Sequence, residues 1–503
     1  MKSGRFLSLD IGATSGRAML AEIAAGRLRL RELHRFAVTH RVLGGTMQWD
    51  FLGLWESVLE SLRACRQAGY RRFDAVGVDT WGCDFGLIGQ DGKLLYSPVC
   101  YRDGRTEGIE RKIAAVADPY ELYRITGLPV LRVNTLSQLV GLSAGGGGAV
   151  LRAGKLMFVS DLLRYFLGGV EGCELTAAGS SQLLDVRRRR WSEQIRRSFK
   201  LPRGLLGRLV EPGQHCGKLL PEVCRQTGLE SCPVIAVAGH DTADALAAAP
   251  YCDQETCLIS CGTWALMGLV LPRDRPLVSR QAYRGRFLNE MGVDSIMFVR
   301  NLVGFYPFEQ LRQAWTEGSA PASYAGLLRE AARQKPFAAM LDFDDPRFFA
   351  LSDAQAALRN YLKDTGQRPL ARPAQIVRTV MEALAWSFRR TLEDLRAVTG
   401  RPVGRICMLG GGARNALLCQ MTADATGCEL LAGPVEATAT GNAGLLALGC
   451  GLLKCAQDIR LLSRRSFRLR RYLPSQSRLW EKEYPRYRRL ASRPQLTAGR
   501  RPR

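Results

Sequence analysis

The pattern of apolar and polar positions predicts strands, glycine turns and helices in two successive series. Residues 5–36 contain two apolar runs joined by a glycine-rich turn, then a second turn and a third run, an order typical of an antiparallel meander. Residues 50–69 follow with apolar side chains at helical spacing. A similar order begins near residue 250, with strand, turn and strand over 255–271 and a long helix over 374–400. The chain therefore predicts two α/β domains that begin in similar fashion.

One predicted strand end carries polar residues. Residues 234–249, "VIAVAGHDTADALAAA", predict a buried strand that runs into Gly239 and an alanine-rich helix that follows. His240 and Asp241 lie between the two. A carboxylate in this place can act as a general base, which accepts the proton of a reacting hydroxyl. The alternatives are structural, with Asp241 as the cap of the helix and His240 as a packed core histidine.

Three glycine-rich turns together predict a bound nucleotide. The first, "LDIGATSGR", has two glycines that would let the backbone approach an anion, with hydroxyls and an arginine between and after them. It matches neither GxxxxGK[ST] nor GxGxxG. Gly262 and Thr263 repeat this chemistry in "LISCGTWAL", and "MLGGGARN" is a strand, a triple glycine and a helix start. Adenosine or a phosphate could lie against such bare backbone.

Composition agrees with a globular α/β protein. The chain has 503 residues, 46% of them hydrophobic, and 52 glycines, which suggests two domains and many tight turns. No apolar run reaches the length of a membrane span, and the N-terminus lacks the apolar core of a signal peptide, so we expect a cytoplasmic protein. The 15 cysteines form no CxxC pair and are expected to be buried thiols. Cys252, Cys257 and Cys261 lack the usual zinc spacing.

The net charge of +24 is unevenly distributed. The segment from Arg460 to the end accounts for +13 of it, and residues 187–190 add four more arginines. Neither stretch has the signature of a nucleic-acid reader, so nucleic acid is the disfavoured partner. We expect residues 461–503 to be a basic C-terminal tail that adds no packed element. Gly145 to Gly148 predict a flexible connector.

Five motifs occur together in the order and spacing of a known family. They are "DIGATSGR", "GHDTADA", "SCGTWA", "LGGGARN" and "GPVEATATGNAG". In this order they resemble the FGGY carbohydrate kinases, and the likeness runs from about residue 5 to about residue 460. The resemblance implies an α/β fold of two RNase H-like, actin-like ATPase domains with a cleft between them. It implies sugar and phosphate binding by residues 1–243 and nucleotide binding by 244–460.

The resemblance also implies roles for single residues. ATP would be bound by Ala13, Thr14, Ser15, Gly16, Arg17, Thr263, Gln310 and Gly411. The sugar would be bound by Gly82, His240, Asp241, Thr242 and Asn301. Asp241 would be the catalytic base, and Asp10 would lie near Mg²⁺, so that the implied cofactors are ATP and Mg²⁺.

Several other residues are weaker candidates or depart from the family pattern. Asp79, Trp81 and Asp84 could form a floor for the sugar, Asp103 and Arg105 a sugar contact or a structural salt bridge, and Glu436 and Asn442 the start of a late helix. Glu309 stands where the family has a glutamine that contacts ATP, with Gln310 next to it. Thr422 and Thr426 replace a cysteine pair of some members, so no disulfide is expected there.

The sugar-side motifs narrow the expected substrate. "VDTWGCDFGLI", "YRDGRT", "RNLVGFY" and "DFDDPRF" resemble the members that phosphorylate L-rhamnulose at its 1-hydroxyl. The closest alternative is another ketose, such as L-fuculose or L-ribulose. A non-catalytic sugar sensor is a further alternative, against which the presence of both Asp10 and Asp241 argues. The expected partners are a small sugar and ATP, with no membrane.

Overall fold

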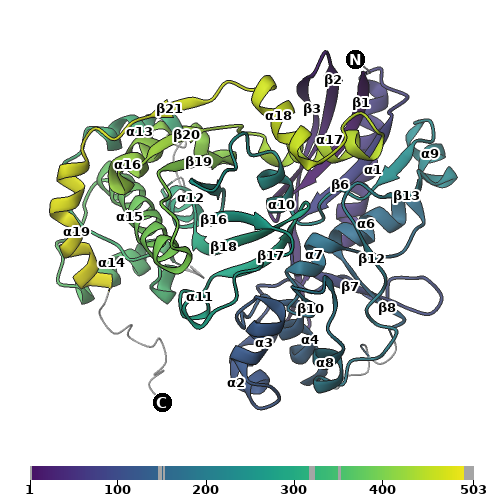
Figure 1. Ribbon diagram of the computed structural model, residues 1–503, viewed down its shortest axis with the longest axis horizontal. Coiled ribbons are helices and arrows are strands. Elements are labelled where there is room, and N and C mark those ends of the chain that lie inside the picture. Colours follow the sequence, from purple (N-terminus) through teal and green to yellow (C-terminus); the bar gives the residue numbers. More distant parts are fainter. Residues whose placement is uncertain (1–2, 145–149, 151–152, 316–322, 349–352, 492–503) are drawn as a thin grey trace. The chain divides into compact units, whose positions relative to one another are not determined.

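The computed structural model describes residues 3–144, 150, 153–315, 323–348 and 353–491. The predicted connector at Gly145 to Gly148 lies outside them. Contacts divide the chain into two units, and each unit contains segments that are far apart in the sequence. The first consists of Met1–Tyr251, Val270–Val299 and Glu436–Arg468, and the second of Cys252–Leu269, Arg300–Val435 and Leu469–Arg503. Figure 1 shows the elements of both.

The first unit contains a six-stranded sheet in the order β13-β14-β6-β1-β2-β3. Its strands are β1 (Gly4–Ile11), β2 (Ser15–Ala24), β3 (Arg27–Ala37), β6 (Ala75–Thr80), β13 (His215–Lys218) and β14 (Pro233–Ile235). Strands β1, β2 and β3 are antiparallel neighbours, which confirms the predicted meander. Strands β1, β6 and β14 are parallel, so their carboxyl ends lie at the same edge.

Helices cover this sheet, and the alternation of side chains along β1 sets which groups face which helix. Leu7, Leu9 and Ile11 belong to a core that also contains apolar residues of α1 (Phe51–Gln67) and α6 (Val159–Gly168). Asp10 points to the other face. Helix α17 (Ala437–Gly449) crosses β1 and β6, and Figure 1 shows it over these strands. Helix α1 confirms the predicted helix over 50–69, with the Asp50 carboxylate accepting the Gly53 N–H at 3.1 Å.

Short elements complete the first unit. Its other helices are α2 (Ile109–Ala114), α3 (Pro119–Thr126), α4 (Thr135–Ala144), α7 (Leu175–Gly179), α8 (Glu193–Ser198), α9 (Pro221–Thr227), α10 (Asp241–Ala247), α11 (Arg280–Arg284) and α18 (Ala456–Ser466). Its short strands are β4 (His40–Leu43), β5 (Thr46–Trp49), β7 (Phe85–Ile88), β8 (Lys155–Phe158), β9 (Cys173–Glu174), β10 (Leu184–Asp185), β11 (Arg190–Trp191) and β12 (Leu209–Val210). The antiparallel pair β17 (Leu288–Gly292) and β18 (Ser295–Val303) packs partly on α7 and α10, and the end of β18 belongs to the second unit.

The second unit is built on strands in the order β16-β15-β19-β20-β21. They are β15 (Thr256–Cys261), β16 (Trp264–Pro272), β19 (Arg405–Leu409), β20 (Glu429–Ala432) and β21 (Arg470–Tyr472). Its helices are α12 (Tyr306–Ala314), α13 (Tyr324–Ala332), α14 (Ala354–Asp364), α15 (Pro373–Thr399), α16 (Ala416–Thr426) and α19 (Ser477–Ala491). The antiparallel pair β15–β16 confirms the predicted strand, turn and strand over 255–271, and α15 confirms the predicted long helix.

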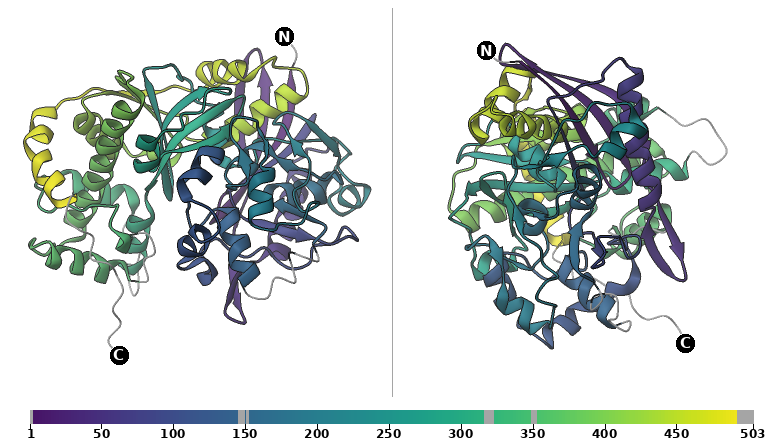
Figure 2. Two further views of the ribbon diagram at one scale, coloured as in Figure 1. Left: turned by 60° about the horizontal axis from the view of Figure 1, so that its bottom comes forward. Right: turned by 90° about the vertical axis from the view of Figure 1, so that its right-hand side faces the viewer.

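The C-terminal segment differs from its prediction. Residues 461–491 include most of α18, strand β21 on the edge of β20, and α19, so the expected basic tail without packed elements is wrong as far as Ala491. Helix α19 contacts α16, and the left view of Figure 2 shows α19, in yellow, beside green helices of the second unit. Its buried Tyr484 and Tyr487 stack on Trp386, and its buried Trp480 contacts the same ring edge-on. The free energy gained by burying aromatic rings on one face of α19 exceeds the cost of the arginines on its other face.

The structure also shows the state of the cysteines and the character of the described helices. All 15 cysteines are free thiols, and most of them are buried. In the described part of the chain, no helix is both long enough and apolar enough to cross a membrane.

Candidate functional site

Polar side chains gather at the carboxyl edge of the parallel strands in the first unit. Asp10 and Asp79 are opposite each other in the register of β1 and β6. The segment after β14 continues this edge, because the Thr80 N–H donates to the Gly239 carbonyl at 3.2 Å and Thr80 bridges to His240. Three chain segments therefore bring acidic and imidazole groups to one end of the sheet.

Asp241 is the first residue of α10, and His240 is its N-cap residue. The Asp241 carboxylate accepts the Thr242 hydroxyl at 3.2 Å, and no side chain caps the helix. The capping role that the sequence left open is therefore not the one observed. Desolvation raises the pKa of Asp241, while the neighbouring His240 lowers it. The side chain keeps 31% of its exposure, so a substrate can reach it.

His240 lies between two carboxylates. Its Nε2 is 3.7 Å from Asp241 Oδ1, and its Nδ1 is 3.3 Å from Glu290 Oε2 on β17. The second pair is an ion pair rather than a well-aligned hydrogen bond. Burial lowers the pKa of His240, but Glu290, Asp241 and Glu174 outweigh it and raise the pKa to about 9. His240 is thus a cation at neutral pH.

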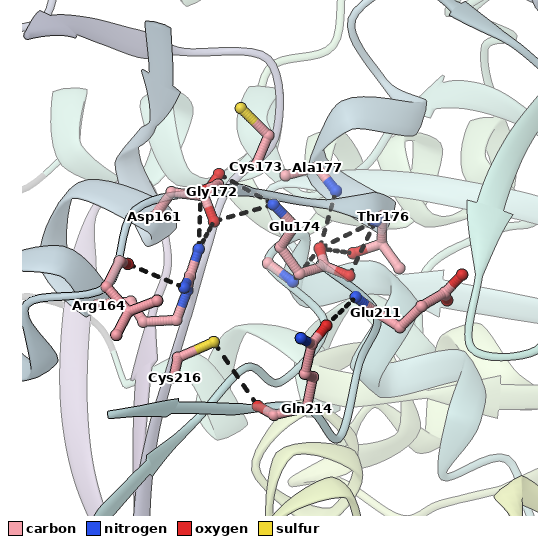
Figure 3. A network of polar contacts seen from close by, with 12 residues as sticks. Asp161, Arg164, Gly172, Cys173, Glu174, Thr176, Ala177, Glu211, Gln214 and Cys216 are labelled. Carbon is pink, nitrogen blue, oxygen red and sulfur yellow. Dashed lines mark hydrogen bonds and ion pairs between the residues drawn. The ribbon is translucent and has the colours of Figure 1, made fainter. Parts of the chain in front are cut away.

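Glu174 fixes the backbone that leads to His240. Its carboxylate accepts the Gly239 N–H at 2.7 Å, the Ala177 N–H at 3.0 Å and the Thr176 hydroxyl at 2.6 Å. That hydroxyl in turn accepts the His240 N–H at 3.2 Å. Figure 3 shows the carboxylate within this network. Burial raises the pKa of Glu174 to about 7, although each of these donors favours the ionised form.

A buried ion pair between Asp161 and Arg164 holds the backbone of Glu174 in place. Asp161 accepts the Glu174 N–H at 3.0 Å and pairs with Arg164 at 2.7 Å, as Figure 3 shows. Arg164 also donates to the Gly172 carbonyl at 2.8 Å. Because both charges are paired and bonded to backbone groups, their burial is tolerated and this loop is held in one conformation.

Asp10 is tied to the first glycine-rich turn. Its carboxylate pairs with Arg17 at 2.6 Å, and Arg17 also pairs with Glu436. Burial raises the pKa of Asp10 to about 6, and Arg17 opposes this rise. Glu436 directs its side chain to Arg17 and makes no capping bond at the start of α17. The predicted phosphate contact of Arg17 stays a prediction, since two carboxylates already occupy the guanidinium.

Further carboxylates are buried beside Asp10. Asn442 on α17 donates to Asp79 Oδ2 at 2.7 Å, which leaves Asp79 Oδ1 without a hydrogen bond. Asp244 on α10 has no side-chain hydrogen bond to either oxygen among the described residues. Burial raises the pKa of Asp79 and of Asp244 well above the usual range. The charge of Asp10 adds to the rise at both residues, and that of Asp79 adds to the rise at Asp244.

The turn from Gly12 to Ser15 joins β1 to β2. The Gly12 N–H donates to the Ser15 carbonyl at 2.9 Å, and Thr14 is exposed. Ala13 and Ser15 are partly buried. A Cβ on Gly12 would meet nothing closer than 3.6 Å, whereas one on Gly16 would overlap the Phe36 ring. Packing against Phe36 is therefore one structural reason for a glycine at position 16, and the predicted phosphate contact of Gly16 stays a prediction.

Gly82 lies against the His240 ring. A Cβ at this position would be 3.2 Å from His240 Cδ2 and 3.2 Å from Ser180 Oγ. The predicted sugar residues Gly82, His240, Asp241 and Thr242 are thus brought together within the first unit.

The predicted sugar floor is partly structural. Asp84 accepts the Trp49 indole N–H at 2.6 Å, the Trp81 indole N–H at 3.0 Å and the Gln138 amide at 2.9 Å. It also accepts the Tyr101 N–H at 3.2 Å. A buried carboxylate with four donors has little capacity left for a ligand.

The paired residues downstream also have structural bonds. Asp103 and Arg105 form the salt bridge that was the structural alternative, at 3.6 Å. Asp103 also accepts the Met47 N–H at 2.8 Å and the Arg105 N–H at 2.9 Å. Arg105 donates to the Gln138 amide oxygen at 2.7 Å.

The second unit contains three of the predicted nucleotide residues, two in segments that follow strands and one on a helix. Thr263 lies in the turn between β15 and β16, and its carbonyl accepts the Tyr306 N–H at 3.2 Å where α12 begins. Gly411 is exposed after β19, the parallel neighbour of β15, and its missing Cβ would lie 3.6 Å from the Cys261 carbonyl. Gln310 lies on α12, where its amide donates to Gln313 at 3.3 Å.

Four other residues that the sequence singled out also lie in this unit. Glu309 pairs with Arg312 on α12 at 3.0 Å, so Gln310 is the freer of the two adjacent candidates. Asn301 is an exposed residue on β18. Thr422 and Thr426 each donate to the carbonyl four residues earlier.

Sequence reasoning missed several buried or partly buried polar residues of the first unit or misread them. These are Glu174, Asp244, Glu290, Glu436 and Asn442. Asn442 had a local signal, since it is a polar residue among small apolar ones in "ATATGNAG". Glu290 also follows an apolar run, but nothing local indicates which group it faces.

Comparison with protein-family models gives two matches. Residues 5–248 match the N-terminal domain of the FGGY family of carbohydrate kinases, and residues 257–450 match its C-terminal domain. The chain belongs to the FGGY family of carbohydrate kinases. The predicted resemblance is confirmed, and the family model covers most of the chain.

Three curated relatives of this FGGY chain are rhamnulokinases. A rhamnulokinase of Bacteroides thetaiotaomicron is 37% identical over 480 residues, which cover 95% of this chain and 98% of that protein. A rhamnulokinase of Pectobacterium carotovorum is 33% identical over 93% of this chain and 92% of its own length. One of Bacillus subtilis is 30% identical over 93% of this chain and 95% of its own.

Solved structures share the fold at low identity. A gluconate kinase from Lactobacillus acidophilus aligns with a TM-score of 0.78 at 16% identity, over 98% of this chain and 99% of that one. A xylulose kinase from the same organism gives 0.76 at 16% identity, over 97% of each chain. The predicted α/β class with two RNase H-like, actin-like ATPase domains is confirmed. The assignment of sugar and nucleotide binding to 1–243 and 244–460 stays a prediction.

Proposed function

We propose that this FGGY kinase transfers the γ-phosphoryl group of ATP to the 1-hydroxyl of L-rhamnulose. The observation that carries the proposal is the end-to-end similarity to the rhamnulokinase of Bacteroides thetaiotaomicron, 37% over 480 residues. The products would be L-rhamnulose 1-phosphate and ADP, formed in the cytoplasm during L-rhamnose breakdown.

The chain offers a carboxylate for the acceptor hydroxyl. Asp241 is accessible at the start of α10, and His240 beside it favours its ionised form. In the proposed reaction, Asp241 accepts the proton of the sugar 1-hydroxyl as that oxygen attacks the phosphoryl group. His240, Thr242 and Gly82 surround this carboxylate within the first unit and would orient the sugar. Asn301 is the proposed sugar contact from β18.

Nucleotide binding is proposed for the two glycine-rich regions. In the first unit Ala13 to Arg17 form a turn with an exposed Thr14. In the second unit Thr263 and Gly411 lie on loops that follow adjacent parallel strands, with Gln310 on α12. Loops at such strand ends present backbone N–H groups to phosphates.

The residues around Asp10 fit a magnesium ion that is held mainly by phosphate and water. Asp10, Asp79 and Asp244 supply carboxylate oxygens, and three of the oxygens on Asp79 and Asp244 lack hydrogen bonds. Within the described residues, no group of three ligands could enclose a metal directly, which agrees with the preference of Mg²⁺ for retained waters. When bound with ATP, the ion would neutralise phosphate charge. Asp10, oriented by Arg17, is the proposed contact.

A ketose panel tests the proposal. The purified protein would be assayed for ADP release with L-rhamnulose, L-fuculose, L-ribulose, D-xylulose and gluconate, each with ATP and Mg²⁺. We expect the highest kcat/KM for L-rhamnulose and a phosphate on carbon 1 of the product by ³¹P NMR. A higher kcat/KM for L-fuculose or L-ribulose would make that ketose the substrate, and no turnover with any sugar would contradict kinase activity.

A further inference from the structure

The strand that carries Glu290 places a buried carboxylate on the far side of His240. Glu290 is the third residue of β17, every residue of which is buried, and it is only 4% exposed. A carboxylate in an apolar strand is costly unless a cation is near it. In the described part of the chain, its one ion-pair partner is His240, at 3.3 Å from Oε2 to Nδ1.

The ring of His240 has a fixed orientation. Gly82 leaves room for the ring on one face, because any Cβ there would be 3.2 Å from Cδ2. The Glu290 carboxylate lies beside Nδ1 of this ring. The opposite nitrogen, Nε2, faces Asp241 Oδ1 at 3.7 Å. The three side chains form a line of carboxylate, imidazole and carboxylate that ends at the proposed base.

We propose that Glu290 is a positioning residue, which holds His240 as an imidazolium with Nε2 towards Asp241 and so keeps the carboxylate of the proposed base in place. The proposal rests on the proposed function for the identity of the base. Glu290 acts through His240 and needs no contact with the sugar. During the reaction the imidazolium keeps both protons, and the hydroxyl proton goes to Asp241.

The charges around His240 support this reading. The groups that face it are Glu290 from β17, Asp241 from α10 and Glu174 from the end of β9. Cys83 lies near Glu290, but burial raises the pKa of its thiol, so it adds no charge. The carboxylates raise the pKa of His240 to about 9 against the effect of burial. In turn, the imidazolium lowers the pKa of Asp241 against desolvation.

The test begins with a titration that needs no substrate. The chain has only four histidines, so ring-labelled histidine gives four NMR signals, and His240→Gln assigns one of them. In the wild type we expect His240 to lose its proton near pH 9. In Glu290→Gln, which keeps the shape and removes the charge, we expect that midpoint to fall towards the usual value of about 6.5. An unchanged midpoint would overturn the proposal whichever sugar is the substrate.

The second part of the test is a pH profile of kcat/KM for the best ketose of the panel. In the wild type, activity should fall as the pH rises through about 9, because neutral His240 keeps its proton on Nδ1 beside Glu290 and has no N–H left to hold the Asp241 carboxylate in place. In Glu290→Gln this alkaline limb should move to lower pH, so that activity at pH 8 drops at least tenfold while that at pH 6 changes less. Glu290→Asp should restore part of the limb. A shifted titration with an unmoved limb would overturn the catalytic part of the proposal.

A matched variant separates electrostatics from folding. Glu382 in the second unit is also a buried carboxylate, paired with Arg378 at 2.7 Å. Glu382→Gln should leave the His240 titration and the alkaline limb unchanged. If both Gln variants moved the limb alike, a general loss of packing would explain it and the proposal would be wrong. If Glu290→Gln does not fold, Glu290→Asp provides a weaker form of the titration test: its carboxylate is one methylene shorter and lies farther from Nδ1, so the His240 midpoint should fall in part, and an unchanged midpoint would overturn the proposal.

Discussion

At the scale of single residues, the buried carboxylates of the first unit differ in how many donors they accept. Asp84 accepts four, so its oxygens are occupied and its role is structural. Asp241 accepts one hydroxyl from Thr242 and remains partly exposed. Both carboxylates belong to sequence motifs, and the number of donors together with the exposure of the side chain separates the structural group from the one a substrate can reach.

The first prediction concerns Asp241. Asp241→Asn keeps the shape of the side chain but cannot accept a proton, so kcat should fall by about 10²- to 10⁴-fold. Binding of ATP and of the ketose, measured by calorimetry, should change little. A folded variant with wild-type turnover would show that another group is the base.

The second prediction concerns Gly82. A methyl group at this position would be 3.2 Å from both the His240 ring and the Ser180 hydroxyl, so the ring must shift. We expect Gly82→Ala to raise the ketose KM by about tenfold, which corresponds to about 1.4 kcal/mol, with the ATP KM unchanged.

Gly404→Ala is the matched control for this change. No atom lies within 4 Å of a Cβ there, so both Michaelis constants should stay at the wild-type values. An unaltered ketose KM in Gly82→Ala would mean that His240 does not contact the sugar.

At the scale of elements, α10 and α17 cross so closely that side chains are excluded. A Cβ on Gly441 of α17 would overlap the Asp244 carbonyl of α10. The small residues of "ATATGNAG" permit this crossing, which also brings Asn442 to Asp79 and Glu436 to Arg17. The sequence indicated a helix here, but the partner helix lies nearly 200 residues earlier and local periodicity carries no trace of it.

The third prediction follows from this crossing. Gly441→Ala should destabilise the protein by about 1–3 kcal/mol, because the helices must separate to admit the methyl group. Urea unfolding followed by circular dichroism measures the effect. Thr438→Ala on the same helix, where the side chain is partly exposed, should stay within about 0.5 kcal/mol of the wild type. Equal stabilities of the two variants would contradict the close crossing.

The fourth prediction concerns α19. Trp480 is 3% exposed and its ring lies 4.4 Å from that of Trp386 and 4.9 Å from that of Phe337, centre to centre. Trp480→Ala should lower the free energy of unfolding by about 3–5 kcal/mol. Leu479→Ala, at a neighbouring position with 37% exposure, should have a much smaller effect. Similar losses in both variants would mean that α19 is not docked by its aromatic face.

At the scale of the whole molecule, local patterns predicted the meander, the long helices and the second series of strands. These patterns did not predict the contacts between segments that lie far apart in the sequence. Trp480, Tyr484 and Tyr487 have helical spacing, but the surrounding arginines and Pro485 obscured it. For the candidate site, motifs indicated Asp241 and His240, whereas Glu290 and Glu174 reach them from other segments and could not be predicted.

The fifth prediction reverses an expectation from the sequence. Removal of residues 475–503 would take away α19 and expose Trp386, so the melting temperature should fall by several degrees and kinase activity should decline with it. Removal of 492–503 keeps every described element and should leave both unchanged. Equal melting temperatures for the two truncated proteins would show that the C-terminal helix contributes nothing to stability.

The order of segments in the first unit has a consequence for synthesis on the ribosome. Strands β1 to β3 emerge first, yet α17, which crosses β1 and β6, is made only after nearly the whole second unit. At about 5–20 residues per second, the uncovered sheet face would wait for tens of seconds. During that interval the acidic edge at Asp10 and Asp79 lacks Glu436 and Asn442. The nascent chain therefore exposes this uncovered face of the sheet to chaperones until α17 has been translated.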